Sequence, residues 1–375
     1  MSIDITFVKS MPKLGFGLMR LPQKDGCIDI PQTTQMVDMF MNAGFRYFDT
    51  AYGYGNGASE RAAKVALVDR YPRESFYLAT KLPAWAGART ADEAKAMFTT
   101  SLERTGAGYF DFYLLHNLGE NRTHYFDDYG IWDFLAEQKE KGLIRRLGFS
   151  FHDKAEVLDE ILASHPEAEF VQLQINYLDW ESESVESRKC WETARRHGKP
   201  IIIMEPIKGG NLATPPENVC ALFRPVHPDA SPSAWALRFA ASLDGVIAVL
   251  SGMSSTDQMQ ENLRTFADFK PMDNDELKTV EQARALINAV PTIQCTACEY
   301  CMKGCPKNIA IPRIFRTFNM FKRFHAVDWA RGDYEWNTKG FGKASDCIEC
   351  GQCEEVCPQH ISIRDELKNA AADLE

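Results

Sequence analysis

The 375-residue sequence lacks several features that would assign it to a familiar class. No apolar run approaches the roughly 20 residues that span a bilayer, and no charged-then-apolar signal peptide opens the chain. No basic block offsets the formal net charge of -10, which argues against a nucleic-acid-binding protein. An apolar content of 45% and a charged content of 25% are typical of a soluble globular protein with room for one large and one small domain.

Two further absences bear on the fold. No G-x-G-x-x-G motif follows an early strand, so the strongest argument for an open dinucleotide-binding sheet is missing. The chain has no low-complexity segment, and its only internal repeat is a pair of cysteine runs near the C-terminus. The fold must therefore be inferred from the hydrophobic pattern that precedes those cysteines.

Short apolar segments alternate with longer helical patterns up to about residue 270. The predicted strands are 14–18, 45–48, 76–80, 110–115, 144–149, 170–174, 201–204 and 246–250. The predicted helices between and after them are 33–42, 59–68, 91–104, 130–141, 154–163, 184–197, 233–241 and 256–266. Eight βα units in roughly 270 residues match a (β/α)8 TIM barrel, although alternation alone also permits an open doubly wound sheet.

Eight of the eleven cysteines form two copies of the pattern C-x2-C-x2-C-x3-C, each followed by proline. This spacing is the ligand arrangement of bacterial [4Fe–4S] ferredoxins, in which the fourth cysteine of each run ligates the other cluster. On that basis one cluster is held by Cys295, Cys298, Cys301 and Cys357, and the other by Cys347, Cys350, Cys353 and Cys305. The sequence therefore predicts a small ferredoxin-like iron–sulfur domain over residues 291–375, after a barrel over residues 1–290.

Zinc and disulfide bonds are the rival interpretations of these cysteines. A structural zinc site usually joins two C-x2-4-C pairs into four ligands, whereas each run here already supplies four thiolates. Disulfide bonds would suit a small secreted domain. Cluster-forming thiols need a reducing compartment, so we expect a cytoplasmic protein. The remaining cysteines, Cys27, Cys190 and Cys220, are scattered and are expected to be ordinary structural or surface residues.

Polar side chains gather at the ends of three consecutive predicted strands. Asp49, Tyr52 and Tyr54 follow the second strand, Lys81 follows the third, and His116 follows the fourth. In a (β/α)8 barrel these ends form the mouth that carries the active site. A tyrosine with a reference pKa of ~10 becomes a better proton donor when an ammonium stabilises its phenolate. We expect Asp49 to hold Lys81, and His116 to position a substrate oxygen.

The sequence also resembles the aldo-keto reductase family over about residues 10–265. The resemblance lies in LGFGLMRLP (14–22), GFRYFDTAYGYG (44–55), ATK (79–81), DFYLLH (111–116) and KGLIRRLGFS (141–150). The family's Asp, Tyr, Lys and His tetrad falls on Asp49, Tyr54, Lys81 and His116, and the five-residue step from Asp49 selects Tyr54 over Tyr52. The chain looks like the subset of this family that carries a C-terminal ferredoxin-like tail.

The resemblance implies a nicotinamide cofactor, NADP or NAD, that lies extended across the barrel mouth. Hydride would pass reversibly between its C4 and a carbonyl carbon while Tyr54 protonates the oxygen. Carried-over contacts are Ser150 and Gln172 (or Gln174) to the carboxamide, Met204 near the stacking position, and Lys208, Gly209 and Gly210 along the pyrophosphate. At the adenosine end, the segment from Ser251 to Ser255, which includes Gly252, is joined by Gln258, Glu261 and Asn262.

Four positions depart from the family pattern. His152 stands where many members have an asparagine, and Met204 stands near the usual stacking aromatic. The positions that commonly supply a Lys and an Arg to the 2′-phosphate are Gly252 and Gln258. The choice between NADPH and NADH is therefore open, and family precedent favours NADPH slightly.

Three functions are consistent with this sequence. The first is an oxidoreductase for a small carbonyl or alcohol substrate, whose clusters are structural or bind a partner. The second is an electron-transfer protein whose clusters exchange electrons with a partner protein or a flavin, although the chain has no flavin motif. The third is a binding module without catalysis, against which the intact tetrad argues. Trp85, Tyr52, Asn117 and Trp180 are candidate pocket residues, but they do not identify the substrate.

Overall fold

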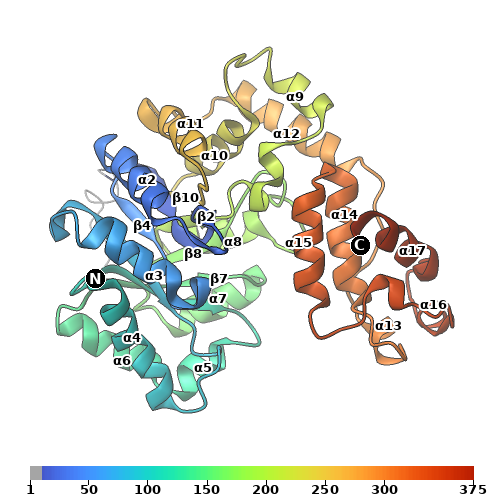
Figure 1. Ribbon diagram of the computed structural model, residues 1–375, viewed down its shortest axis with the longest axis horizontal. Coiled ribbons are helices and arrows are strands. Elements are labelled where there is room, and N and C mark those ends of the chain that lie inside the picture. The colour runs from blue at the N-terminus through green and yellow to red at the C-terminus, as the bar shows by residue number, and fades with distance from the viewer. Residues whose placement is uncertain (1–10) are drawn as a thin grey trace. The chain divides into compact units, whose positions relative to one another are not determined.

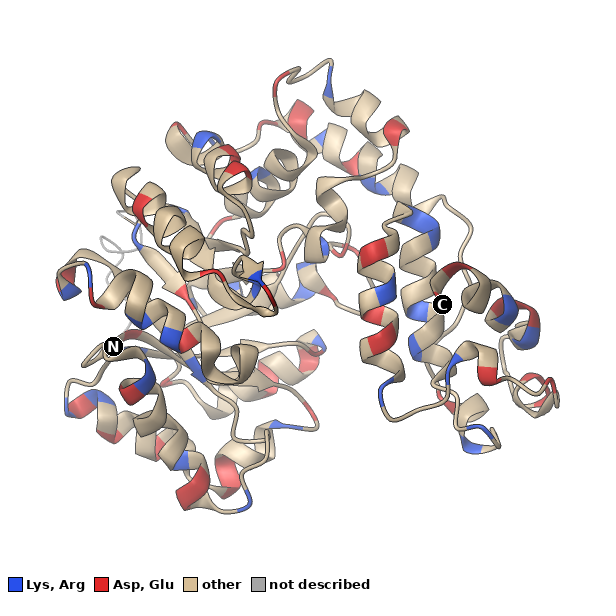
Figure 2. Cartoon of the chain, viewed as in Figure 1, with Lys and Arg blue, Asp and Glu red and all other residues tan. Residues whose placement is uncertain are grey.

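The computed structural model describes residues 11–375, which divide into two compact units (Figure 1). The first unit comprises the chain up to Gly209 together with Ser233–Val280. The second comprises Gly210–Pro232 and Glu281–Glu375. Acidic and basic residues are interspersed along the helices of both units (Figure 2). Among the described residues, no helix combines the length and apolar character needed to cross a membrane.

The first unit is a closed barrel of eight parallel strands, as the sequence predicts. Its strands, neighbour to neighbour, run in the order β1, β10, β9, β8, β7, β6, β5, β4. Their bounds are β1 Leu14–Gly17, β4 Tyr47–Asp49, β5 Tyr77–Leu82, β6 Phe110–Leu118, β7 Ile144–Phe151, β8 Phe170–Gln174, β9 Ile201–Met204 and β10 Val246–Ser251. A short hairpin, β2 Gln23–Lys24 and β3 Cys27–Ile28, lies outside the barrel sheet.

Helices surround this barrel because each strand is followed by an amphipathic segment. They are α2 Ile30–Asn42, α3 Ala58–Ala63, α4 Ala91–Thr105, α5 Thr123–Asp128, α6 Ile131–Glu140, α7 Ala155–Ser164, α8 Ser187–Arg196, α10 Pro232–Ser242 and α11 Thr256–Ala267. Side chains cap three of them, since Asp29, Thr90 and Ser255 each accept a hydrogen bond from a first-turn backbone N–H. These caps fix where α2, α4 and α11 begin.

Aromatic residues fill the barrel interior. The rings of Tyr47 and Phe112 lie 5.0 Å apart, and those of Phe112 and Phe170 lie 5.2 Å apart, in edge-to-face pairs. Ile202 and Ile247 belong to the same buried cluster. Because the centre is packed with side chains, a substrate can reach only the barrel ends.

The observed strands differ from the predicted ones mainly at their carboxyl ends. β5 continues to Leu82 and β6 to Leu118, so Lys81 and His116 lie within strands and not after them. The backbone of Lys81 pairs with Leu114 of β6, whereas His116 lies at a register shift of β6 between Leu115 and Leu118.

The second unit is helical and is built around the cysteine runs. Its elements are η5 Lys208–Ala213, which starts in the first unit, α9 Glu217–Phe223, α12 Asn274–Asn288, which crosses the boundary, α13 Tyr300–Lys303, α14 Ile311–Phe324, α15 Val327–Thr338, η6 Ala344–Asp346, α16 Gln352–Glu355 and α17 Ile363–Leu374. Figure 1 shows α14 and α15 side by side. Phe315 and Phe318, from the insert between the cysteine runs, are buried in this unit's core, whereas Trp336 is 76% exposed.

Candidate active site and cysteine chambers

The four residues of the predicted tetrad lie at one end of the barrel. Asp49 is the last residue of β4, Lys81 is near the end of β5, and His116 is near the end of β6. Tyr54 begins the short helix η2 Tyr54–Gly57, which follows β4. Because these strands are parallel neighbours in the sheet, their carboxyl ends meet at the same mouth.

Lys81 and Asp49 form an ion pair inside this mouth. The Lys81 ammonium also donates to the backbone oxygen of Thr50 at 2.8 Å. From across the barrel, the side-chain amide of Gln172 donates to the second Asp49 oxygen at 3.0 Å. Burial alone would lower the pKa of Lys81, but Asp49 and Tyr54 outweigh it and leave that pKa raised. The lysine is therefore held charged.

Tyr54 lies against this ion pair. The Lys81 ammonium is 5.1 Å from the centre of the Tyr54 ring. Burial raises the pKa of the phenol, and the nearby ammonium offsets only part of that rise. From the sequence we expected Lys81 to lower the pKa of Tyr54. In the structure, desolvation of the phenol raises this pKa by more than Lys81 lowers it. Tyr54 is consequently fully protonated at neutral pH and can donate a proton.

His116 faces Tyr54 with its ring centre 6.0 Å away in an edge-to-face arrangement. Burial, followed by the positive charge of Lys81, lowers the pKa of His116 well below its ordinary value. The imidazole is therefore neutral. Within residues 11–375 its Nδ1 is buried without a hydrogen-bond partner. Trp85 donates to the His116 backbone oxygen at 2.8 Å and borders the same space.

The ends of β7 and β8 carry the predicted carboxamide residues. Ser150 accepts a hydrogen bond from the Asn117 backbone N–H at 2.8 Å. His152 pairs with Gln174 at 3.3 Å, which occupies Gln174 and leaves Gln172 as the residue beside Asp49. A polar cavity of about 370 Å³ adjoins this side of the mouth, lined by Phe151, His152, Asp153, Leu173, Gln174, Ser184, Val185 and Cys190.

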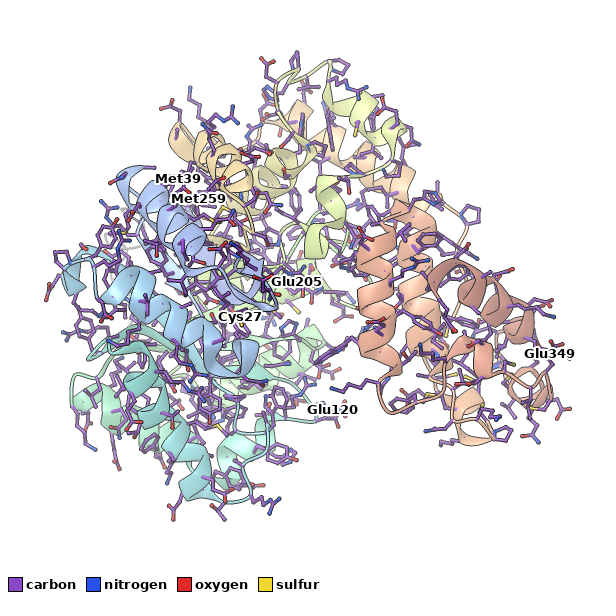
Figure 3. The ribbon with its side chains drawn as sticks, in the orientation of Figure 1. Cys27, Met39, Glu120, Glu205, Met259 and Glu349 are labelled. Carbon is purple, nitrogen blue, oxygen red and sulfur yellow. The ribbon has the colours of Figure 1, made fainter. Side chains whose placement is uncertain are left out.

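The segment after β9 is held by residues that the sequence did not single out. Lys208 donates to both oxygens of Asp179, at 2.7 and 2.8 Å, and Asn176 donates to the same carboxylate at 2.8 Å. Met204 ends β9, and Glu205 follows it in the left-handed region, with φ 54° (Figure 3). Gly209 is the last residue of the first chain segment of the barrel unit, and Gly210 belongs to the second unit.

The predicted adenosine-binding segment is an ordered loop and helix start. Ser255 caps α11, and the Gln258 side chain accepts from the Ser254 backbone N–H at 2.8 Å. Asn262 donates to Ser251 at 2.8 Å. Ser233 donates to Glu261 at 2.8 Å. These bonds set the shape of the segment around Gly252.

Arg20 is a cation at this segment that the sequence analysis missed. Its guanidinium donates to the Gly209 backbone oxygen at 3.2 Å, and its stem lies against Gly252, where an added Cβ would be 3.5 Å away. The Ser254 hydroxyl donates to the Arg20 backbone oxygen at 2.7 Å. Arg20 lies at the end of the helix η1 Leu18–Arg20, far from residue 252 along the chain. The sequence alone therefore does not reveal its contact with Gly252.

In the second unit, the eight cysteines line two separate chambers. The first chamber, with about 320 Å³ of empty space, is lined by Cys295, Cys298, Cys301 and Cys357. The second chamber, with about 330 Å³, is lined by Cys305, Cys347, Cys350 and Cys353. Each chamber thus takes three cysteines from one run and the fourth from the other, which is the crosswise grouping of two-cluster ferredoxins.

The spacing of these thiols also distinguishes a cluster from a single ion. Throughout the described residues, no three His, Cys, Asp or Glu side chains converge closely enough to hold one metal ion. Zinc ligands lie about 2.3 Å from the metal, and these thiols are not grouped closely enough for such a site. The donor set therefore fits a [4Fe–4S] cluster in each chamber.

Comparisons with known proteins agree with both parts. Residues 13–285 match the family described as aldo/keto reductase, and residues 294–361 match the 4Fe-4S dicluster domain. An aldo-keto reductase from Mycobacterium sp. (strain KMS) is 31% identical over 141 residues, 38% of this chain and 46% of the relative. That alignment therefore spans about half of the relative's length. An aldo-keto reductase from Mycolicibacterium vanbaalenii is 29% identical over 263 residues, 70% of this chain and 84% of the relative.

A solved structure shows the same barrel. An aldo-keto reductase from Klebsiella pneumoniae in complex with NADPH superposes with a TM-score of 0.58 at 17% identity, covering 72% of this chain and 90% of that one. At that identity the likeness concerns the fold. The match over residues 13–285 shows that the chain belongs to the aldo/keto reductase family, and the match over residues 294–361 shows that a 4Fe-4S dicluster domain follows its barrel.

Proposed function

We propose that this protein is an NADPH-dependent reductase of a small carbonyl compound, working reversibly on the corresponding alcohol. The observation that carries the proposal is the placement of the half-buried Tyr54 against the buried Lys81–Asp49 pair. A protonated phenol beside a fixed ammonium is equipped to protonate an oxygen and to tolerate the phenolate that results. Neutral His116 stands opposite it.

Some of these residues take part in proton transfer, and others hold the reacting groups in position. Nicotinamide, when bound, supplies or accepts the hydride. Tyr54 gives its phenolic proton to the carbonyl oxygen, and Lys81 stabilises the phenolate left behind. Asp49 keeps Lys81 charged and fixed in position. A ring N–H of neutral His116 can donate to the same oxygen, which holds the carbonyl close to Tyr54.

The mouth also fits the nicotinamide end of the cofactor. The amide N–H of Gln172 is taken by Asp49, which leaves the Gln172 amide oxygen to accept from the carboxamide. Ser150 presents its hydroxyl at the neighbouring strand end. Met204, at the end of β9, offers a polarisable thioether for contact with the ring.

Arg20 supports NADPH over NADH. Gly252 and Gln258 bring no charge to the adenosine segment, but Arg20 lies over Gly252 and has no acidic partner among the described residues. A guanidinium is well suited to a phosphate group. The Klebsiella relative that shares this fold binds NADPH.

The two chambers would hold the iron–sulfur clusters, each with the crosswise set of four cysteines. The domain boundary that we propose, between residues 290 and 291, falls between the two family matches. Replacing Cys357 with serine should remove the cluster whose other ligands are Cys295, Cys298 and Cys301, and halve the bound iron. Loss of the cluster of Cys347 and Cys350 instead would contradict the crosswise assignment.

The alternative function, electron transfer through the clusters, is favoured by the presence of the chambers themselves. Anaerobic titration of the iron-replete protein with NADPH distinguishes the two. We expect no bleaching of the broad visible absorption of the clusters, and oxidation of NADPH only when an aldehyde such as 4-nitrobenzaldehyde is added. Bleaching by NADPH alone would favour the electron-transfer function.

A further inference from the structure

The turn that follows Tyr54 has an unusual backbone conformation. Gly55, Asn56 and Gly57 are all left-handed, with φ of 56°, 54° and 82°. Glycine adopts this region without strain, and asparagine visits it more readily than most residues. Such residues normally occur singly, so local preference does not favour three in succession. Contacts from neighbouring elements must therefore hold this turn, and the start of it that carries Tyr54, in place.

Arg104 of α4 provides such contacts on both sides of Tyr54. Its Nη1 donates to the backbone oxygen of Tyr52 at 3.0 Å, and its guanidinium carbon lies 4.3 Å from the centre of the Tyr52 ring. The guanidinium also packs against Gly57, where an added Cβ would lie only 2.6 Å away. The backbone N–H of Tyr52 in turn donates to the backbone oxygen of Lys81 at 3.1 Å. Tyr52 therefore links Arg104 to the strand that carries the lysine.

Arg104 is itself held by Glu60, whose side chain has no exposure to solvent. Nη1 of Arg104 donates to Oε2 of Glu60 at 3.1 Å. The other carboxylate oxygen accepts from the hydroxyl of Thr80 at 2.8 Å, and Thr80 immediately precedes Lys81 in β5. The carboxylate thus joins α3, α4 and β5. A buried ion pair is often no more stabilising than apolar side chains of the same size, so stability alone does not account for this one.

We propose that Arg104 and Glu60 are positioning residues for the reduction, because they fix the turn that places the Tyr54 phenol against Lys81. Glu60 orients the guanidinium, and the guanidinium fixes the chain two residues before Tyr54 and three residues after it. A misplacement of about 1 Å in a reacting group can lower turnover about a hundredfold. This inference rests on the proposed role of Tyr54 as the proton donor.

The variants Arg104→Met and Arg104→Met/Glu60→Gln separate positioning from stability. Arg104→Met leaves the Glu60 carboxylate buried without its cation, so we expect a lower Tm and a kcat for 4-nitrobenzaldehyde that falls about 10- to 100-fold. The double variant removes the buried charge and should recover part of the Tm. Its kcat should stay low, because the Tyr52 oxygen is still not held. Arg104→Lys keeps a cationic donor and should restore part of kcat.

A second buried ion pair in the barrel unit supplies the matched control. Arg73 pairs with Asp111 at 2.7 Å, and their side chains are 14% and 11% exposed. Asp111 lies at the start of β6, at the end of the barrel away from Tyr54. Arg73→Met should therefore lower the Tm as Arg104→Met does, and leave the kcat of the folded enzyme close to normal.

All rates are measured on the full-length, iron-replete protein below the lowest Tm of the set, and fluorescence titration gives the dissociation constant for NADPH, which should change little. Equal losses of kcat in Arg73→Met and Arg104→Met would refute the positioning role. So would a kcat that recovers together with the Tm in the double variant, which also serves if Arg104→Met does not fold. Failure of the unmodified protein to reduce the aldehyde would instead refute the proposed function, and the positioning role with it.

Discussion

Lys81 and Asp49 form an ion pair whose side chains are only 1% and 4% exposed. Removing the charge of either residue would leave the other charge without a partner, at a place in the barrel mouth that is almost inaccessible to water. Asp49 is also the acceptor for Gln172, so the pair fixes β4, β5 and β8 relative to one another. The catalytic tyrosine that we propose rests on this pair.

Replacing Asp49 with asparagine should lower the free energy of unfolding by about 3–5 kcal/mol, the usual cost of breaking a buried ion pair. The double variant Asp49→Asn/Lys81→Met should recover part of that loss, because no buried charge remains. Lys278→Met, at an ion pair that is 70% and 87% exposed, serves as the control and should cost under about 1 kcal/mol. Chemical unfolding measures all three. Equal losses in Asp49→Asn and Lys278→Met would show that burial of the pair has no energetic consequence.

Tyr54→Phe should lower kcat for aldehyde reduction by about 10² to 10⁴-fold, the range that a positioned proton donor contributes. The dissociation constant for NADPH should change little, because the ring and its packing remain. Tyr109→Phe is the matched control, because Tyr109 precedes β6 at the end of the barrel opposite the mouth, and it should keep near-normal turnover. Steady-state oxidation of NADPH and fluorescence binding measure the two effects. Equal activity in the two variants would refute Tyr54 as the donor.

The dependence of reduction on pH follows from the shifted pKa values of Tyr54 and His116. Burial raises the pKa of Tyr54 above its ordinary ~10, so the donor keeps its proton through neutral pH and loses activity only as pH rises through that value. The pKa of His116 lies far below its ordinary ~6.5, so it stays neutral. We expect kcat/KM for reduction to show no break near pH 6.5. A fall below pH 6.5 that disappears in a His116→Gln variant would contradict the neutral state of this imidazole.

Arg20→Gln should raise KM for NADPH by about ten- to a hundredfold, since a hydrogen bond to a charged group contributes about 1.5–3 kcal/mol. KM for NADH should stay the same, because NADH lacks the 2′-phosphate. Arg61→Gln is the control, as Arg61 is an exposed residue of α3 that donates to the Asn56 backbone oxygen at 3.0 Å. An equal rise in KM for both cofactors would place Arg20 on the pyrophosphate and contradict its role in selectivity.

Sequence reasoning located the barrel strands well because strands buried on both faces are continuous apolar runs. β8 and β9 match their predicted bounds, 170–174 and 201–204. Strand ends were less accurate: β6 was predicted to end at residue 115, but after a register shift between Leu115 and Leu118 it pairs with β7 again at Leu118. The cysteine spacing specified the crosswise grouping because ligand geometry constrains spacing more tightly than packing does.

Contacts between distant segments could not be predicted from the sequence. Arg20 reaches Gly252 only because β1 and β10 are neighbours in the closed barrel, and nothing near Arg20 in sequence marks it. The pKa of Tyr54 was misjudged for a related reason. A neighbouring lysine can be inferred from the tetrad, but the extent of burial that opposes it depends on packing around the whole mouth.

Hydride transfer by NADPH deuterated at C4 tests the central claim most directly. A single turnover of the iron-replete protein with this cofactor and 4-nitrobenzaldehyde is analysed by mass spectrometry of the alcohol. Two NADPH samples are used, each deuterated at one of the two C4 positions. We predict that one of these two cofactors delivers its deuterium to the carbinol carbon, and that Tyr54→Phe forms little product. Oxidation of NADPH with no deuterium in the alcohol from either cofactor would show that electrons leave the nicotinamide by another route, and would contradict the barrel as a carbonyl reductase.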